Sequence, residues 1–307
     1  MLRSIKITIW ILLGALMASC EKEAKEQVRP SSEPKAGDHK RSRKRSSANG
    51  LAVKTSIYSH SDDLLAGGRH RPARTLPLSA EKDEAHADEL CRRIVGADKN
   101  ALLAIIDEAQ GLSSTAMIRV VDALLLAGDA EIRGKALALL EGFDSPLLVP
   151  LAVKAVADMD AEVRLEALEV ARAISDVSVL KVYQTGLKDI DGNVRIASFV
   201  DASARNDAVY PQILQEAVKS SHGDVALAGL NHLRTPSQTA HVDPIIRNLG
   251  HSDAAVRDLA HEILYLTFQV DLKTSEQAAN WWARKKNLFD EHLNLKDPAT
   301  IPLLEAP

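Results

Sequence analysis

Two titratable residues in the middle of the chain have types and spacing that could do chemistry. Asp201 and His232 lie 31 residues apart, and the residues at the same repeat spacing elsewhere, Leu139, Val170 and Ile263, are apolar. We expect neighbouring repeats to place the two side chains together. A structural hydrogen bond between them is the first prediction, and a ligand contact that senses pH is the alternative, because histidine changes charge near neutral pH.

Three arginines accompany this pair. We predict that Arg172, Arg205 and Arg234 join Asp201 and His232 in one central binding patch. A catalytic site needs a converging acid, base, nucleophile or set of metal ligands, and the sequence contains no strong motif for any of them. We therefore expect a binding protein rather than an enzyme, with no catalytic residues, no metal and no cofactor.

The first residues of the chain predict export. Arg3 and Lys6 are followed by an uncharged, mainly apolar run of 13 residues, 7–19. A positive start followed by an apolar run of this length is typical of a signal peptide. The run is too short for a membrane-spanning helix, which needs about 20 residues. We therefore expect residues 1–19 to be a signal peptide.

The end of this segment, Leu-Met-Ala-Ser-Cys, resembles the lipobox of bacterial lipoproteins, in which small residues precede a cysteine that becomes lipidated. The resemblance implies a lipid anchor on Cys20, and the Glu21 that follows implies delivery to the outer membrane, facing the periplasm or the surface. More than one acyl chain gives stable anchoring. The alternative is an ordinary secretory peptide. Cys91 is the second cysteine, and we expect it to be buried and inert.

Residues 20–75 are predicted to be a disordered, basic tether, since their apolar positions are scattered and lack periodicity. Residues 21–75 contain 13 Lys or Arg against 7 Asp or Glu, a net charge of +6, whereas residues 76–307 contain 23 against 35, a net charge of −12. The basic run 39–45 either keeps the tether extended or contacts an anionic membrane surface. The acidic body argues against a nucleic-acid partner.

One short motif returns every 31 residues through the body. It is an Asp followed four residues later by an Arg, with a β-branched residue before the Arg. Four copies are complete: Asp129 with Arg133, Asp160 with Arg164, Asp191 with Arg195, and Asp253 with Arg257. The spacing requires a further copy at His222, which has lost both residues, and a weak first copy begins at Asp98.

The motif indicates the start of a helix. Asp is a strong N-cap acceptor, the β-branched residue three positions later should face the core, and a small residue four positions further on lets neighbouring helices approach closely. One pair of helices cannot bury its apolar face alone, so the pairs must stack. We expect an all-α fold over residues 76–293, a solenoid of about six helical pairs, followed by a tail over residues 294–307.

A C-terminal capping helix is expected over residues 275–293, because a repeat array must cover its exposed core edge. This segment carries Trp281 and Trp282, with Arg284 and Lys285 close behind them. The alternative is an aromatic and basic patch that binds a glycan or an anionic partner.

An Asp-x-x-Val-Arg sequence that opens the second helix of a pair resembles the HEAT repeat, especially the short HEAT-like class of the phycobilin lyases. The resemblance covers residues 98–268. It implies a hydrogen-bonded ladder between the motif Asp and Arg of successive units, and the joint loss of both residues at His222 and Ala226 agrees with that pairing.

The repeat array, in a sequence without a catalytic motif, predicts a scaffold or adaptor that binds a protein partner. Two alternatives remain open: a lyase-like or chaperone-like accessory factor for cofactor or protein maturation, which the resemblance to the phycobilin lyases implies, and a structural spacer in the cell envelope. The sequence leaves the oligomeric state open.

Overall fold

A computed structural model describes residues 74–297. Within this range the chain contains 13 α-helices and two strands of two residues each, so the predicted all-α class is confirmed. The predicted signal peptide 1–19, the lipidation site Cys20, the tether up to residue 73 and the last ten residues of the tail lie outside the described residues.

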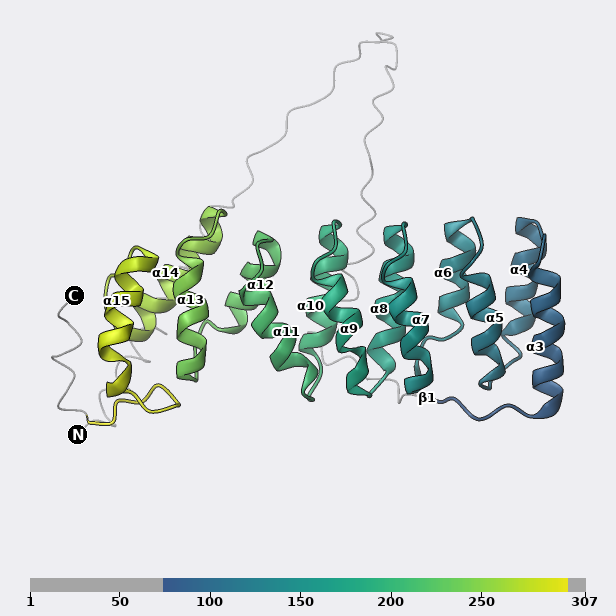
Figure 1. Ribbon diagram of the computed structural model, residues 1–307, viewed down its shortest axis with the longest axis horizontal. Helices are drawn as coiled ribbons and strands as arrows, with labels where there is room; N and C mark the ends of the chain where they lie inside the picture. The colour runs from purple at the N-terminus through teal and green to yellow at the C-terminus, as the bar shows by residue number, and fades with distance from the viewer. Residues whose placement is uncertain (1–73, 298–307) are drawn as a thin grey trace, which may run out of the picture. The chain divides into compact units, whose positions relative to one another are not determined.

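The helices lie side by side in a row (Figure 1). Those that begin at a copy of the motif are α4 (Lys99–Ala109), α6 (Ala130–Ala138), α8 (Ala161–Ala173), α10 (Gly192–Ser203), α12 (Gly223–His232) and α14 (Ala254–Phe268). The others are α3 (Glu81–Ile94), α5 (Ala116–Leu124), α7 (Val149–Ala155), α9 (Leu180–Gly186), α11 (Val209–Val218), α13 (Val242–Asn248) and α15 (Ser275–Lys285). Short 3₁₀ turns are η1 (Pro146–Leu148), η2 (Val177–Val179), η3 (Thr239–His241) and η4 (Lys286–Leu288).

The packing follows the repeat. From α3 to α14, each odd-numbered helix contacts the even-numbered helix that follows it. The even-numbered helices also contact one another in succession from α4 to α14, as do the odd-numbered helices from α7 to α15. The loops from odd to even helices therefore share one edge of the row, and the loops from even to odd helices share the other.

The motif begins helices as the sequence predicts. The side chains of Asp98, Asp129, Asp160, Asp191 and Asp253 each accept a backbone N–H in the first turn of the helix that follows. His222 makes no such side-chain bond. The β-branched residues of the motif are almost completely buried: Ile132, Val163, Val194, Val225 and Val256. The motif thus caps each helix and directs one side chain into the core.

The small residues let helices approach closely, as predicted. In α12, a Cβ atom added to Gly229 would lie 2.9 Å from the backbone nitrogen of Val218 at the end of α11. The neighbouring column of large apolar residues is interrupted by His261. This residue is half-exposed, and its Nε2 lies 2.8 Å from a carboxylate oxygen of Asp271.

The start of the described chain is held against the loop between α6 and α7. Strand β1 (Arg74–Thr75) pairs in parallel with β2 (Phe143–Asp144). Arg74 Nη2 donates to the Glu141 carbonyl at 2.9 Å, and its guanidinium carbon lies 4.2 Å from the centre of the Phe143 ring. The two residues at the end of the predicted tether therefore belong to the folded body.

The C-terminal helix is shorter than predicted. It ends at Lys285 and not at residue 293, and η4 follows. The chain then turns because the Asp290 carboxylate accepts the N–H groups of His292 and Asn294, both at 2.9 Å. Lys296 N donates back to the Leu288 carbonyl at 2.9 Å. The first residues of the predicted tail therefore pack against the end of the body.

The aromatic residues of α15 are buried. Trp281 and Trp282 lie against Phe268 of α14, with ring centres 5.0 and 5.5 Å away. The two indoles are only 1% and 3% exposed, so they are not available to stack on a glycan or a cation. This overturns the predicted aromatic alternative for this segment.

The buried residues form two clusters. The first runs from Leu76 to Val225 and the second from Val218 to Phe289, so they meet where α11 packs on α12. Cys91 is partly buried against the first cluster, and burial raises the pKa of its thiol. No helix within residues 74–297 is long and apolar enough to cross a membrane.

Candidate functional site

The arginines of the motif form buried ion pairs with carboxylates of the next unit. Arg133 contacts Asp158 through Nε and Nη2, and both N–O distances are 2.7 Å. Arg164 contacts Asp189 in the same way at 2.6 and 2.7 Å. The side chains of these pairs are 6–13% exposed. The prediction that the motif Asp is the ladder partner is wrong, because Arg133 and Arg164 bind the aspartate two residues before it.

The third arginine pair shows how the degenerate copy is accommodated. Arg195 reaches Asp224, two residues after His222, with an Nη2–Oδ2 distance of 2.6 Å. The loss of Asp at position 222 therefore does not remove a ladder partner. Arg257 instead donates to the carbonyls of His251 and Ser252 at 2.7 and 2.8 Å. It has no carboxylate partner within residues 74–297.

Two carboxylates of these pairs have lowered pKa values. For Asp158, burial opposes the charged form, but the hydrogen bonds from Arg133 and from the Asp160 N–H, together with the charges of Arg133 and Arg164, outweigh it, so that the pKa of Asp158 lies below its usual value. The same balance, with Arg195 as the partner, lowers the pKa of Asp224. Breaking one of these pairs would leave an uncompensated charge in the interior.

A column that sequence reasoning missed supports each of these loops. Asp158, Asp189, Ser220 and His251, here called the loop column, each accept the backbone N–H of the residue two positions later, at 2.8–3.1 Å. The spacing of two aspartates in Asp158-Met159-Asp160 could have revealed it. The first side chain of such a triplet turns inward and the third caps a helix, so the middle one points to solvent.

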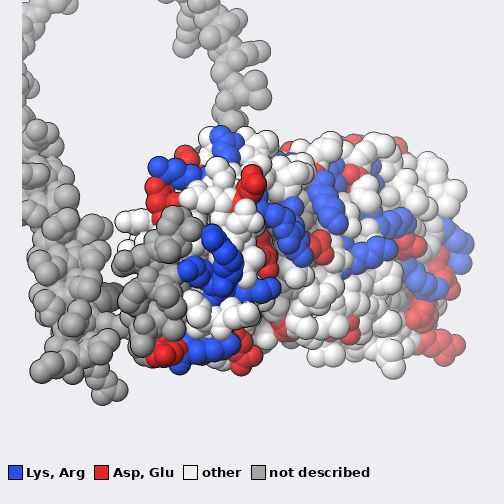
Figure 2. Space-filling view, turned by 60° about the vertical axis from the view of Figure 1, so that its left-hand side comes forward, with Lys and Arg blue, Asp and Glu red and all other residues white. Residues whose placement is uncertain are grey.

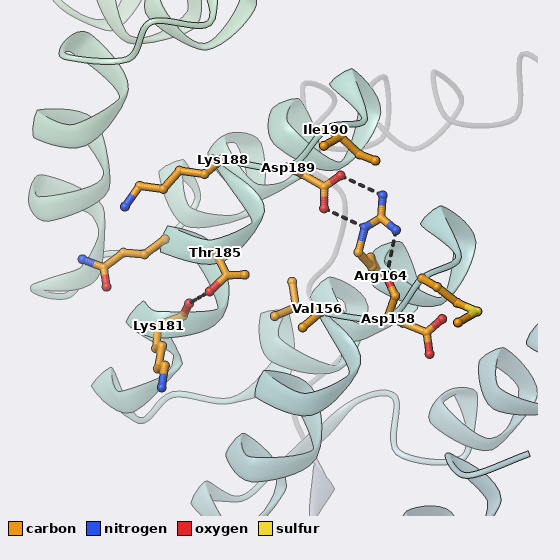
Figure 3. A pocket seen from close by; sticks show the side chains of 11 residues that line it. Val156, Asp158, Arg164, Lys181, Thr185, Lys188, Asp189 and Ile190 are labelled. Carbon is orange, nitrogen blue, oxygen red and sulfur yellow. Dashed lines mark hydrogen bonds and ion pairs between the residues drawn. The ribbon is translucent and has the colours of Figure 1, made fainter.

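The middle residues of two triplets are apolar and fully exposed. Met159 and Ile190 are 91% and 92% exposed, the highest values among the large apolar residues of the described chain. They line a cleft of about 640 Å³, here called the α7–α9 cleft. Lys181 and Thr185 lie on α9, and Lys188 lies in the loop after it. Arg164 and Asp158 lie across the cleft from them (Figure 3).

The cleft offers exposed positive charge. Its two carboxylates, Asp158 and Asp189, are already held by arginines. Lys188 is 73% exposed and lies 3.6 Å from Glu216, and Lys181 forms no ion pair within the described residues. On the face seen in Figure 2, Lys and Arg side chains form a band across the surface, so the acidic excess of the body is not spread evenly. The cleft therefore combines apolar and cationic groups.

The predicted hydrogen bond between Asp201 and His232 is not formed. His232 Nδ1 instead lies 2.7 Å from the Tyr210 hydroxyl, and its ring packs edge-on against Phe199 with 4.9 Å between ring centres. Asp201 is buried toward α8 and α9, where burial and then the charge of Glu169 raise its pKa to about 7. The two residues therefore share a repeat position but have different surroundings.

The predicted central patch divides into separate groups. Arg172 pairs with Glu169. Burial and the charge of Asp201 raise the pKa of the Tyr183 hydroxyl, and the charges of Arg205 and Arg172 partly oppose this rise. Arg205 also pairs with Asp207 and donates to the Ile174 carbonyl at 2.7 Å. Arg234 lies apart, 3.0 Å from Glu262 of α14. The structure brings Arg172, Asp201 and Arg205 together but places His232 and Arg234 elsewhere.

Residues 74–297 contain no cluster of His, Cys, Asp or Glu that could hold a metal ion. Comparison with known proteins gives no family: no family model matches the chain, and no curated protein matches it. The α7–α9 cleft, with its exposed apolar and cationic side chains, is the candidate site.

Proposed function

We propose that this protein is a non-enzymatic, membrane-anchored adaptor whose body binds a protein partner. In this proposal the body is a HEAT-like α-solenoid of about six helical pairs, and α15 covers its C-terminal end. The recurring N-caps and the regular contacts between helices support this arrangement. Stacked repeats of this kind create extended binding surfaces.

The observation that carries the proposal is the exposure of Met159 and Ile190. The same position of the other loops holds Ala97, Gly128, Ser221 and Ser252, so the fold does not require a large apolar side chain there. Exposed apolar side chains at the rim of a cleft are typical of sites where another protein binds.

The binding proposal is tested with the full-length protein, solubilised in detergent and used as bait on a membrane extract of the source organism. We expect it to retain a protein reproducibly. A retained pigment or small cofactor would favour the accessory factor instead, and retention of nothing would favour the spacer.

The anchor is a separate part of the proposal. We propose that Cys20 is lipidated and holds the protein at the outer membrane, which is supported by the lipobox resemblance. Cys20→Ala should move the protein from the membrane fraction to the soluble fraction, whereas Cys91→Ala should leave it in the membrane. If Cys20→Ala remained in the membrane fraction, the lipid anchor would be ruled out.

A further inference from the structure

We propose that the α7–α9 cleft binds an acidic, amphipathic helix of the partner. Apolar side chains of that helix pack against Met159 and Ile190, and its carboxylates pair with Lys181 and Lys188. This inference rests on the proposed function, since it names the kind of partner segment that the adaptor would hold.

Local geometry makes Met159 and Ile190 suitable contacts. Each follows a loop-column aspartate that turns inward to an arginine and precedes an aspartate that caps a helix. The loops are thus held on both sides of the exposed residue. A partner that binds these two side chains therefore meets a surface that is already ordered, which lowers the entropic cost of binding.

Further apolar side chains extend this surface along the same edge. Val95 and Leu126, in the two preceding odd-to-even loops, are 84% and 76% exposed. These loops are neighbours, because Lys99 Nζ lies 2.9 Å from Asp129 and Arg133 bridges to Asp158. Even-to-odd loops carry less exposed side chains, with Leu147 at 53% and Val177 at 55%.

The spacing of this row selects the form of the partner segment. Packed helices are about 8–10 Å apart, so Met159 and Ile190, which hold the same position in successive loops, recur at roughly that distance. Residues seven apart on an α-helix are separated by about 10.5 Å along its axis. A helix with one apolar residue in every seven can therefore contact successive loops.

Charge selects the composition of the segment. The carboxylates of the cleft are neutralised by buried arginines, whereas the ammonium groups of Lys181 and Lys188 extend from α9 and the loop after it (Figure 3). An acidic helix would gain attraction from both lysines. A basic helix would place like charges beside them, which is unfavourable.

The test is photo-crosslinking in the full-length protein. A photoreactive amino acid replaces Met159 or Ile190, the protein is irradiated in membranes of its source organism, and the adducts are identified by mass spectrometry. We expect adducts on a partner peptide that has apolar residues at a spacing of seven and Asp or Glu between them. The same substitution at Val177, on the opposite edge, serves as the control and should give no such adduct.

A synthetic copy of the adduct peptide is then titrated into variants of the full-length protein. Met159→Ser with Ile190→Ser should weaken binding at least tenfold, and so should Lys181→Glu with Lys188→Glu. Lys135→Glu is a matched control, because Lys135 is 50% exposed and its Nζ lies 3.8 Å from Glu131, much as Lys188 lies near Glu216. It should leave the affinity unchanged.

Several results would overturn the inference. A basic adduct peptide, or affinity unchanged by Lys181→Glu with Lys188→Glu, would exclude an acidic helix. Adducts formed with a second copy of this chain would assign the cleft to self-association. If the bait retained a protein that Met159→Ser with Ile190→Ser still bound fully, the adaptor function would stand and this surface would be wrong. Failure of the bait itself would remove the function as well.

Discussion

The region from α6 to α10 and the region from α11 to α14 build the same loop with different side chains. In the first, Asp158 and Asp189 accept the backbone N–H and also hold an arginine of the preceding unit. In the second, Ser220 and His251 accept the same bond without an arginine partner. The comparison separates two roles: any acceptor can support the turn, but only the carboxylates also hold an arginine, whereas His251 reaches the preceding unit through the Ser220 carbonyl, 3.2 Å from its Nε2.

The exposed middle residue of the odd-to-even loops also differs between these two regions. Met159 and Ile190 belong to the linked region, whereas Ser221 and Ser252 occupy the same position in the other region. The two buried clusters meet at the start of the second region, where α11 packs on α12. The apolar side chains therefore occur where the loops are held by arginine pairs.

The largest effect should come from breaking an arginine pair. Arg164→Ala leaves Asp189 buried without a countercharge, and we expect a loss of about 3 kcal/mol in the free energy of unfolding. Arg257→Ala removes hydrogen bonds to two carbonyls only and should cost about 1 kcal/mol. Urea unfolding of both variants measures the difference. Equal losses would show that the pairs do not distinguish the two regions.

The two regions also differ in how closely their helices approach a glycine. A Cβ added to Gly229 would lie 2.9 Å from Val218 N, so Gly229→Ala should cost about 1–3 kcal/mol. In α6, a Cβ added to Gly134 would lie 3.8 Å from its nearest neighbour, Glu166 Cγ, so Gly134→Ala should gain about 0.5–1 kcal/mol. Thermal unfolding gives the sign of each change, and the same sign for both variants would contradict the packing argument.

The buried carboxyl of α10 should make stability depend on pH. The pKa of Asp201 is raised from 3.8 to about 7, so the folded state binds more protons than the unfolded state between these values. Stability therefore falls as pH rises through this window. Asp201→Asn should reduce the dependence, which Glu166 shares because burial and then the charge of Glu141 raise its pKa to about 7. The substitution should raise the free energy of unfolding by on the order of 1–2 kcal/mol at pH 8, with little change at pH 4.

A matched control for Asp201 is Asp207, whose pKa is lowered by its hydrogen bond with Arg205. The stability that Asp207 contributes is present above its unfolded pKa and is lost at lower pH. Asp207→Asn should therefore destabilise the protein at pH 8, the opposite of Asp201→Asn. Urea unfolding at pH 4 and pH 8 measures both variants. If both changed the free energy of unfolding in the same direction at pH 8, the opposite roles assigned to Asp201 and Asp207 would be wrong.

The smallest effect on stability should come from the exposed apolar residues. Met159→Ser with Ile190→Ser introduces the residue type that the other region uses at this position, and we expect a change of no more than about 0.5 kcal/mol in the free energy of unfolding. A loss well above that value in thermal unfolding would mean that these side chains have a structural role after all.

Local signals in the sequence predicted the helix starts. The N-cap aspartates, the buried β-branched column and the small residues depend on contacts within one helical pair, so a 31-residue spacing is enough to place them. The ladder partner depends on which side chain of the next unit reaches the arginine. The family resemblance implied the Asp of the motif, but the arginines reach the aspartate two residues before it.

The candidate site was harder to predict for a similar reason. Asp201 and His232 do share a column, but repeat position does not determine side-chain direction, and Phe199 and Tyr210 surround the histidine. The sequence did not indicate Met159 and Ile190 as binding residues, because an apolar residue in a sequence ordinarily predicts a place in the core. The pairing of Arg74 with Phe143 joins segments far apart in the chain, and two residues are too few for a strand pattern.

The pairing of β1 with β2 has a mechanical consequence for a chain held at its N-terminus. A pull on the residues before Arg74 would reach the body first at the loop between α6 and α7, through the backbone bonds of β1 and the contact with Phe143. Terminal repeats are the first to fray when an array is loaded from its end. Here the load would bypass α3 and α4, so these helices are shielded from peeling, and the force would act on the edge opposite the α7–α9 cleft.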